Sequence, residues 1–214
     1  MTTLRVLVEA TPKRAFASAL DWPGLARSGR DEAAALVALA VAMQRYAPVA
    51  ELAGEPFDPA AGFEVVERVP GDASTAFGVP AMVASADRAP ADAADARRLA
   101  ALVDAAWRTF DAVAAAAPES LRKGPRGGGR DRTKIVDHVN GADAAYASVL
   151  GRRHRPVDRA SVLAMRADVL GVLREPSDGS PVAGRRWPPR YAARRIAWHA
   201  LDHAWEIEDR IGPA

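Results

Sequence analysis

The last helical segment of the chain constrains its fold most. It runs from Arg190 to Arg210 and reads RYAARRIAWHALDHAWEIEDR. His199 and His203 are four residues apart, so a helix places both imidazoles on one face, one turn apart. A third histidine, His138, lies within an earlier helical stretch, KIVDHVNGADAAYASVL. We predict that these three histidines converge on one divalent metal ion.

An HxxxH pair alone is as typical of an ordinary buried or surface pair as of a metal site. Two features of the helices favour the metal. His138 and His199 each lie ~10–15 Å from the start of their helix, which is one height if both helices run the same way in an up-and-down bundle. Gly141 and Ala142 leave space beside His138, where a glycine costs ~1 kcal/mol relative to alanine.

The chemistry of three imidazoles also favours a metal. Neutral imidazole binds Zn²⁺, Ni²⁺ or Fe²⁺, and three of them leave a coordination position open to water or substrate. Positions 200–202 are Ala-Leu-Asp, so the glutamate of an HExxH metalloprotease is missing. The sequence therefore predicts an open metal site that differs from that of the zinc proteases.

The composition of the chain restricts its number of domains, its chemistry and its partners. The 214 residues suffice for one large domain or two small ones, and cysteine is absent, so any thiol chemistry needs a thiol from outside the chain. No secretory signal or apolar run of ~20 residues is evident, so we expect a cytoplasmic protein that does not cross a membrane. A net charge of +2 with a pI of 9.3 is weak support for a nucleic-acid partner, which is not expected.

Residues 1–88 are predicted to form a small α+β unit. Strand patterns occur at residues 4–10, 14–20 and 62–71, and residues 74–80 are a further strand candidate. Between them, residues 31–47 repeat apolar side chains at helical spacing. The order strand, strand, helix, strand is typical of an α+β fold.

This unit resembles the HicB-like antitoxin domain. The resemblance rests on residues 16–43, FASALDWPGLARSGRDEAAALVALAVAM, where a strand ends in a Pro-Gly loop before an alanine-rich helix opened by acidic residues. Known HicB proteins oppose a partner ribonuclease, and many carry a DNA-binding tail that this sequence lacks. The alternative is a module that packs against its neighbour or against a second subunit, which would make the protein a homodimer.

Residues 89–214 are predicted to form four helices. An apolar stripe from Leu99 to Ala114 marks the first, which ends at Pro118. The second begins near residue 131 or 133 and runs to 150, the third spans 158–173, and Pro189 opens the fourth. Four helices of these lengths indicate a four-helix bundle. The Gly127–Gly129 run lacks the spacing of a nucleotide-binding loop.

Residues from about 92 to 214 resemble the DinB/YfiT-like superfamily of metal-binding four-helix bundles. The features that carry the resemblance are His138 in KIVDHV, the WHALDH pair His199 and His203, and Trp107 in the first helix. The resemblance implies a three-histidine site on the inner faces of the bundle. For some members it implies metal-assisted transfer or isomerisation with a low-molecular-weight thiol such as mycothiol or bacillithiol. The short third helix and the Arg-, Pro- and Gly-rich loop after it depart from the family pattern. The resemblance therefore does not predict the shape of the substrate pocket.

Two cations are predicted to bind substrate. Arg195 lies one turn before His199, and Lys134 lies one turn before His138, so both are expected on the side of the metal nearer the helix starts. Basic loops are expected at that end, where they either attract an anionic small molecule or are simply solvated. These loop residues are Arg122, Lys123, Arg126, Arg130, Arg132, Arg185, Arg186 and Arg190.

Two roles are possible for the acidic side chains near the histidines. Asp202 and Glu206 either orient His199 or His203 as hydrogen-bond acceptors or form exposed ion pairs with Arg195 or Arg210. Trp198 and Trp205 are expected in the core, and His154 is expected to be exposed and uninvolved.

Two functions follow from these observations. In the first, the protein is a metal-dependent enzyme, a thiol transferase, isomerase or hydrolase, in which the metal activates a bound thiol or water. In the second, it is a non-catalytic binding or regulatory protein that acts through the HicB-like unit.

Overall fold

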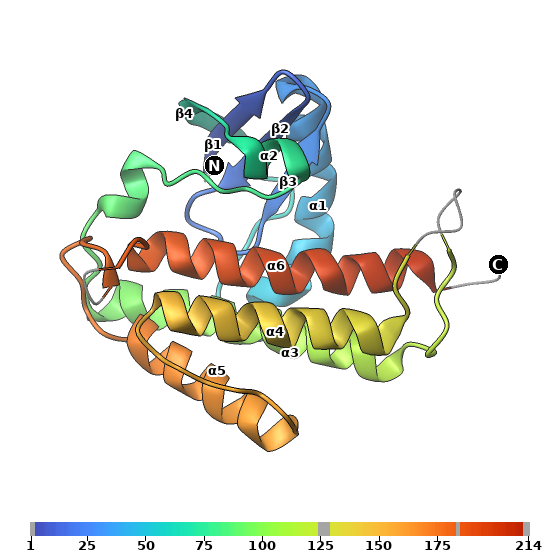
Figure 1. Cartoon of the computed structure of the whole chain (residues 1–214). Helices are drawn as coiled ribbons and strands as arrows, with labels where there is room; N and C mark the ends of the chain where they lie inside the picture. The colour runs from blue at the N-terminus through green and yellow to red at the C-terminus, as the bar shows by residue number, and fades with distance from the viewer. Residues whose placement is uncertain (1–2, 124–128, 183–184, 212–214) are drawn as a thin grey trace.

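A four-stranded sheet and six α-helices make up the described part of the chain. The computed structural model describes residues 3–123, 129–182 and 185–211. The mixed α+β class predicted from the sequence is confirmed. Figure 1 shows the sheet lying above α6, the helix that runs along the middle of the molecule.

The sheet is built from two hairpin connections and one crossover. Strands β1 (Leu4–Thr11), β2 (Arg14–Ala19) and β3 (Ala26–Gly29) are antiparallel neighbours. β4 (Phe63–Pro70) pairs with β1 in parallel, giving the order β3-β2-β1-β4. A parallel neighbour needs a long crossover, which α1 (Glu32–Leu52) supplies while covering one face of the sheet.

Three of the predicted strands are confirmed, and the N-terminal unit differs from the prediction in three places. β3 was not predicted, because its short run, Ala26–Gly29, has no alternation of apolar and polar side chains. The strand expected at 74–80 is wrong, because Asp72 caps a short helix there, α2 (Ala73–Phe77). α1 also continues through Pro48 to Leu52 instead of ending at residue 47.

The four helices expected in the C-terminal part are all present. They are α3 (Ala93–Ala116), α4 (Arg132–Val149), α5 (Arg159–Leu173) and α6 (Pro189–Arg210). The Asp158 carboxylate caps α5 by accepting from the backbone N–H of Ser161, and Pro189 occupies the first turn of α6, where no N–H is needed.

The helix directions differ from an up-and-down bundle. Arg130, two residues before α4, pairs with Glu206 in the last turns of α6 at 3.6 Å, so α4 and α6 are antiparallel. Arg166 of α5 pairs with Asp143 of α4, and α5 runs parallel to α4 (Figure 1). The connection of residues 150–158 returns along the length of α4, which about nine extended residues suffice to span.

α6 joins the sheet to the other helices. Asp87, in the 3-10 helix η1 (Ser85–Arg88), accepts two hydrogen bonds from Arg194, and both side chains are buried. Trp198 packs edge-on against Phe16 of β2 at a centroid distance of 6.0 Å. One apolar core extends from the sheet through α1 and α3 to α6. The division into units 1–88 and 89–214 stays a prediction.

α1 is the one helix among the described residues that is long and apolar enough to cross a membrane by composition. Its most apolar window has a mean hydropathy of 1.4, and 39% of that window is buried inside the structure. A helix packed into a protein core passes the same test, so this observation is weak evidence for a membrane span.

The buried Arg194–Asp87 pair yields a stability prediction. Arg194→Ala leaves the Asp87 carboxylate buried without its cation, which is expected to lower the free energy of unfolding by about 3–5 kcal/mol. The matched control is Arg68→Ala, which breaks an exposed pair with Glu32 and is expected to lower the free energy of unfolding far less. Urea unfolding followed by tryptophan fluorescence measures both changes, and equal losses would contradict the prediction.

Candidate metal site

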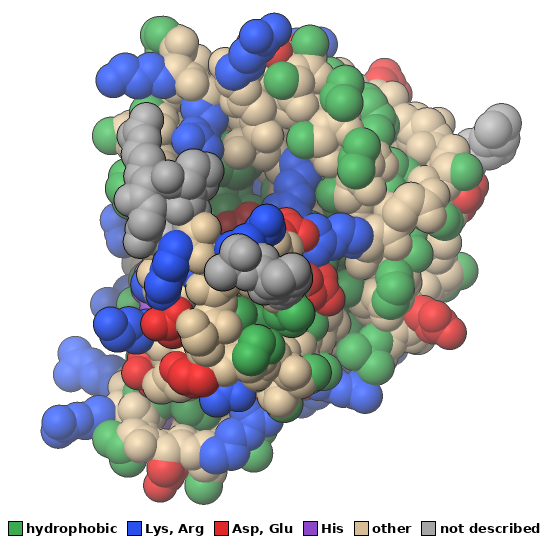
Figure 2. Space-filling model, turned by 90° about the vertical axis from the view of Figure 1, so that its right-hand side faces the viewer, with side chains coloured by type: hydrophobic (Ala, Val, Ile, Leu, Met, Phe, Trp, Pro, Cys, Tyr) green, Lys and Arg blue, Asp and Glu red, His purple; other side chains and the backbone are tan. Residues whose placement is uncertain are grey.

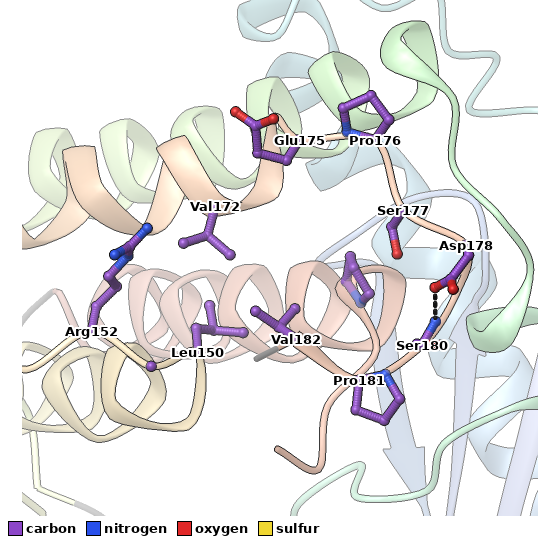
Figure 3. Close-up of a pocket in the computed structure, with 12 residues that line it drawn as sticks. Leu150, Arg152, Val172, Glu175, Pro176, Ser177, Asp178, Ser180, Pro181 and Val182 are labelled. Carbon is purple, nitrogen blue, oxygen red and sulfur yellow. Dashed lines mark hydrogen bonds between the residues drawn. The ribbon is translucent and has the colours of Figure 1, made fainter. Parts of the chain in front are cut away.

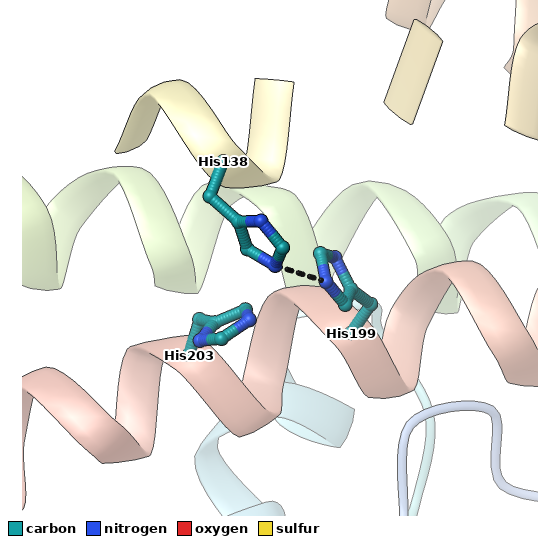
Figure 4. Close-up of side chains that lie close together, drawn as sticks. All are labelled: His138, His199 and His203. Carbon is teal, nitrogen blue, oxygen red and sulfur yellow. Dashed lines mark hydrogen bonds between the residues drawn. The ribbon is translucent and has the colours of Figure 1, made fainter. Parts of the chain in front are cut away.

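The three predicted histidines lie together between α4 and α6. His199 and His203 are one turn apart on α6, and His138 faces them from α4 (Figure 4). Each offers one ring nitrogen, and these three atoms all lie within 4.8 Å of one another. The predicted convergence is therefore confirmed, and the three side chains are close enough to bind one metal ion.

The convergence arises for a different reason from the one expected. The prediction that the two helices run the same way is wrong, because α4 and α6 are antiparallel. His199 lies near the middle of α6, with ten residues before it and eleven after it, so its height is similar from either end. His138, six residues after the start of α4, can therefore reach the histidine pair from the opposite direction.

Glu206 fixes the ring of His203. The Nδ1 atom of His203 lies 2.6 Å from Oε2 of Glu206, which turns Nε2 away from the carboxylate. Arg210 donates to the other oxygen of Glu206 at 2.9 Å. The hydrogen bond with His203 lowers the pKa of Glu206, so the carboxylate stays ionised. Among metal-binding histidines, a carboxylate on the second ring nitrogen is a recurrent means of orienting the first.

His138 and His199 approach each other through their Nε2 atoms, which lie 3.2 Å apart. Burial, followed by repulsion from His203 and Arg195, lowers the pKa of His199 to about 2. Burial and the nearby Arg130 also lower the pKa of His138. Both rings are therefore neutral near pH 7, which is the form that binds metals.

Aromatic rings border the histidines on the side toward the start of α6. Tyr146 of α4 stands edge-on to His199 at a centroid distance of 5.6 Å and also contacts Trp187 at 5.3 Å. Neither Tyr146 nor Trp187 was predicted from the sequence to lie near the histidines. Tyr146 follows His138 by eight residues, a spacing that keeps it near the same helix face, but the contact with Trp187 depends on tertiary packing.

The two predicted substrate-binding cations lie on opposite sides of the histidines, because α4 and α6 are antiparallel. The guanidinium of Arg195 lies over the rings of Tyr146 and Trp198 at 5.3 and 4.7 Å, and its Nη1 is buried without a hydrogen-bond partner among the described residues. Lys134 is exposed, one turn toward the start of α4. Their roles in substrate binding stay predictions.

The expectation of one basic end is wrong. The loop before α4 meets the end of α6, and the loop before α6 lies at the other end of the molecule. Several of the arginines and lysines also have partners: Lys123 pairs with Asp131, Arg132 with Glu119, and Arg190 with Asp95. Arg126 and most of the Gly127–Gly129 run lie outside the described residues.

The remaining predictions near the site have mixed outcomes. Glu206 fulfils both of its alternatives, since it contacts His203 and Arg210. Asp202 fulfils neither and pairs with Arg27 of β3. Trp198 and Trp205 are buried as expected. His154 is half-buried beside Asp168, which corrects the expectation of an exposed ring, and it is not part of the histidine cluster.

A cavity lies away from the histidines. It has a volume of ≈ 530 Å³ and is formed where the ends of α4 and α5 meet the loop before α6 (Figure 3). Leu150, Val172 and Val182 form its apolar part, and Asp178 and Ser180 lie at its edge. None of the three histidines lines it, so the candidate metal site is a separate feature of the surface between α4 and α6.

Comparison with known proteins adds no relative. No protein-family model matches the chain, and neither a curated protein nor a solved structure matches it. The resemblances to DinB-like bundles and to HicB-like domains therefore stay predictions, and the case for function rests on the site itself.

The low pKa of His199 predicts how stability depends on pH. Below pH ~6.5 the unfolded chain takes up a proton at His199 while the folded chain does not, so in metal-free protein this residue lowers stability by about 1.4 kcal/mol per pH unit as the pH falls from 6 to 4. His199→Phe removes this contribution. Urea unfolding in the presence of a chelator measures the free energy of unfolding of both proteins. As the pH falls, the variant should become more stable relative to the parent. A difference that is independent of pH would contradict it.

Proposed function

We propose that this protein is a metal-dependent enzyme in which His138, His199 and His203 hold a divalent ion, Zn²⁺, Ni²⁺ or Fe²⁺. The observation that carries the proposal is the approach of three ring nitrogens to within 4.8 Å. Two imidazole nitrogens on one tetrahedral ion lie about 3.4 Å apart, given bonds of about 2.0–2.1 Å. The Nε2 atoms of His138 and His199, at 3.2 Å, fit that spacing closely.

The donor set suits an ion with an open position. All three ligands are neutral imidazoles, and the carboxylate of Glu206 is already hydrogen-bonded to His203. His138 is exposed, so a small molecule can approach from its side. A divalent ion held here would supply Lewis-acid chemistry, lowering the pKa of a thiol or water that binds to it.

The side chains around the histidines would position the substrate. Arg195 places a positive charge beside His199, held in place by the rings of Tyr146 and Trp198. An anionic group on the substrate would pair with this charge, and Lys134 would add a second, more mobile charge on the other side. The chain has no cysteine, so a nucleophilic sulfur would come from a second molecule.

The reaction class we propose is transfer or isomerisation that uses a low-molecular-weight thiol of the mycothiol or bacillithiol type. The resemblance to DinB-like bundles supports this choice, as does the antiparallel placement of cations on both sides of the histidines. Hydrolysis, with water in place of the thiol, is the related reaction. The alternative to an enzyme is a binding or regulatory protein that acts through the sheet and α1, which would need no metal.

Metal content distinguishes the enzyme from this alternative. Purified protein is expected to contain about one divalent ion per chain by mass spectrometry of the elements, since three histidines form one site. His199→Ala or His203→Ala is expected to lose it. His154→Ala is the matched control, because it removes the one histidine outside the cluster. Protein that binds no ion at micromolar concentration, or that binds it equally in all variants, would end the proposal.

Thiol binding tests the proposed reaction class. Protein loaded with Co²⁺ is expected to develop a sulfur-to-cobalt absorption band when 2-mercaptoethanol or mercaptosuccinate is added. Arg195→Gln should weaken binding of the anionic mercaptosuccinate about tenfold or more and leave neutral 2-mercaptoethanol nearly unchanged, because only the former pairs with the guanidinium. Arg68→Gln, on the exposed surface of β4, is the control. No band with either thiol would exclude a thiol-using reaction.

A further inference from the structure

The outward face of α1 is apolar and has no partner among the described residues. Val37 and Val41 are 65% and 68% exposed, although they lie in the middle of a long helix. Their exposed neighbours follow at helical spacing, and we call this surface the α1 outer face. It comprises Ala33, Val37, Ala40, Val41, Pro48 and Leu52.

No charged residue interrupts the first half of this face, and the exposed Gln44 and Glu51 lie in its second half. From residue 33 to residue 44 the chain has no Asp, Glu, Lys or Arg. Arg45 pairs with Glu208 and Asp209 in the last turn of α6. Figure 2 looks at the side of the molecule on which α1 lies, and hydrophobic side chains gather in its upper part with few charged ones among them. Single exposed valines are ordinary, but a continuous apolar stripe indicates an interaction surface.

Charges mark both ends of the α1 outer face. Arg30 precedes the helix, its side chain is 89% exposed, and it pairs with the neighbouring Asp31. Glu51 lies in the last turn, exposed and without an ion pair among the described residues. The two residues are about 30 Å apart along the helix, and the midpoint between them falls at Ala40 and Val41. An antiparallel copy of the helix, related by a two-fold axis at Val41, would therefore bring each Arg30 beside the other Glu51.

A groove continues the face at its C-terminal end. It has a volume of ≈ 660 Å³, and Gln44, Pro48, Glu51, Glu55 and Phe57 line part of it. In the antiparallel arrangement Glu51, in the lining of this groove, would meet the beginning of the other α1, which carries Arg30, whereas Glu55 is already paired with Arg98. The charge complementarity at the ends thus agrees with the shape of the surface.

We propose that the α1 outer face docks a second copy of this chain, forming a two-fold symmetric dimer through antiparallel α1 helices. The apolar middle of the face would be buried around the axis, where residue 41 of one copy meets residue 41 of the other. A membrane surface fits less well, because anionic lipid favours a cluster of unpaired cations, whereas Arg30 is paired with Asp31 and Arg45 is paired with Glu208 and Asp209.

The size of the face sets the expected strength. One side of a helix of 21 residues offers a strip about 30 Å long and 10 Å wide, so two copies would bury about 600 Å² in total, which is less than the ~1,000 Å² of stable specific interfaces and fits only a weak, transient dimer. We therefore expect a dimer with a dissociation constant in the micromolar range, on the order of 1–100 μM.

Sedimentation equilibrium of the full chain over that concentration range tests the proposal. The parent protein is expected to dimerise, and Val41→Lys to be monomeric, with a dissociation constant raised at least a hundredfold by two lysines at the axis. Val157→Lys is the matched control, since Val157 is 75% exposed on the connection between α4 and α5. Circular dichroism checks that each variant is folded.

Reversal of the charges at the two ends of the face tests the same proposal more specifically. Arg30→Glu and Glu51→Arg are each expected to weaken the dimer several-fold, and the double variant to restore it. A parent that stays monomeric, or a dimer that Val41→Lys leaves unchanged, would overturn the proposal. Binding of monomeric protein to phosphatidylglycerol vesicles that Val41→Lys abolishes would overturn it in favour of a membrane. Metal content should not change in these variants, so the result is independent of the proposed enzyme.

Discussion

The burial of α6 on several sides is the constraint on which the rest of the structure depends. One side of this helix packs on the sheet through Trp198 and the Arg194–Asp87 pair, and another contacts α3. The face that remains, with His199 and His203, is turned toward α4. Because rotation of α6 would expose Trp198 or break a buried ion pair, the direction of both imidazoles is fixed by packing far from them. The positions of His199 and His203 therefore depend on the packing of the core and not on the loops.

The electrostatics of the cluster explain why a metal is the reasonable occupant. Three imidazoles in contact cannot all carry a proton, and burial already holds His199 neutral. Their only carboxylate partner among the described residues is Glu206, which contacts His203 alone and is shared with Arg210. The Nε2 atoms of His138 and His199 face each other at 3.2 Å, and two neutral imidazoles can share at most one hydrogen bond there. An ion bound between these atoms would use the lone pairs of both nitrogens.

Local signals predicted most helices and the histidine pair, whereas tertiary features were out of reach. Asp158 and Pro189 mark helix starts by chemistry that depends on neighbouring residues alone, and an HxxxH spacing is a property of one helix. The direction of α4 depends on the path of residues 150–158, which the sequence does not specify, so the expected basic end was wrong. Tyr146 and Trp187 meet across two elements, and β3 is too short for periodicity to reveal. The predicted convergence of His138 holds nevertheless, because His199 lies near the middle of its helix and its height is similar from either end.

The most direct test of this account is a crystal structure of protein soaked with Zn²⁺, with anomalous diffraction recorded on both sides of the zinc absorption edge. We predict one strong anomalous peak within about 2.0–2.2 Å of ring nitrogens of His138, His199 and His203, with Glu206 still hydrogen-bonded to Nδ1 of His203. An anomalous peak elsewhere on the chain, or three histidines in these positions with no peak between them, would contradict the account.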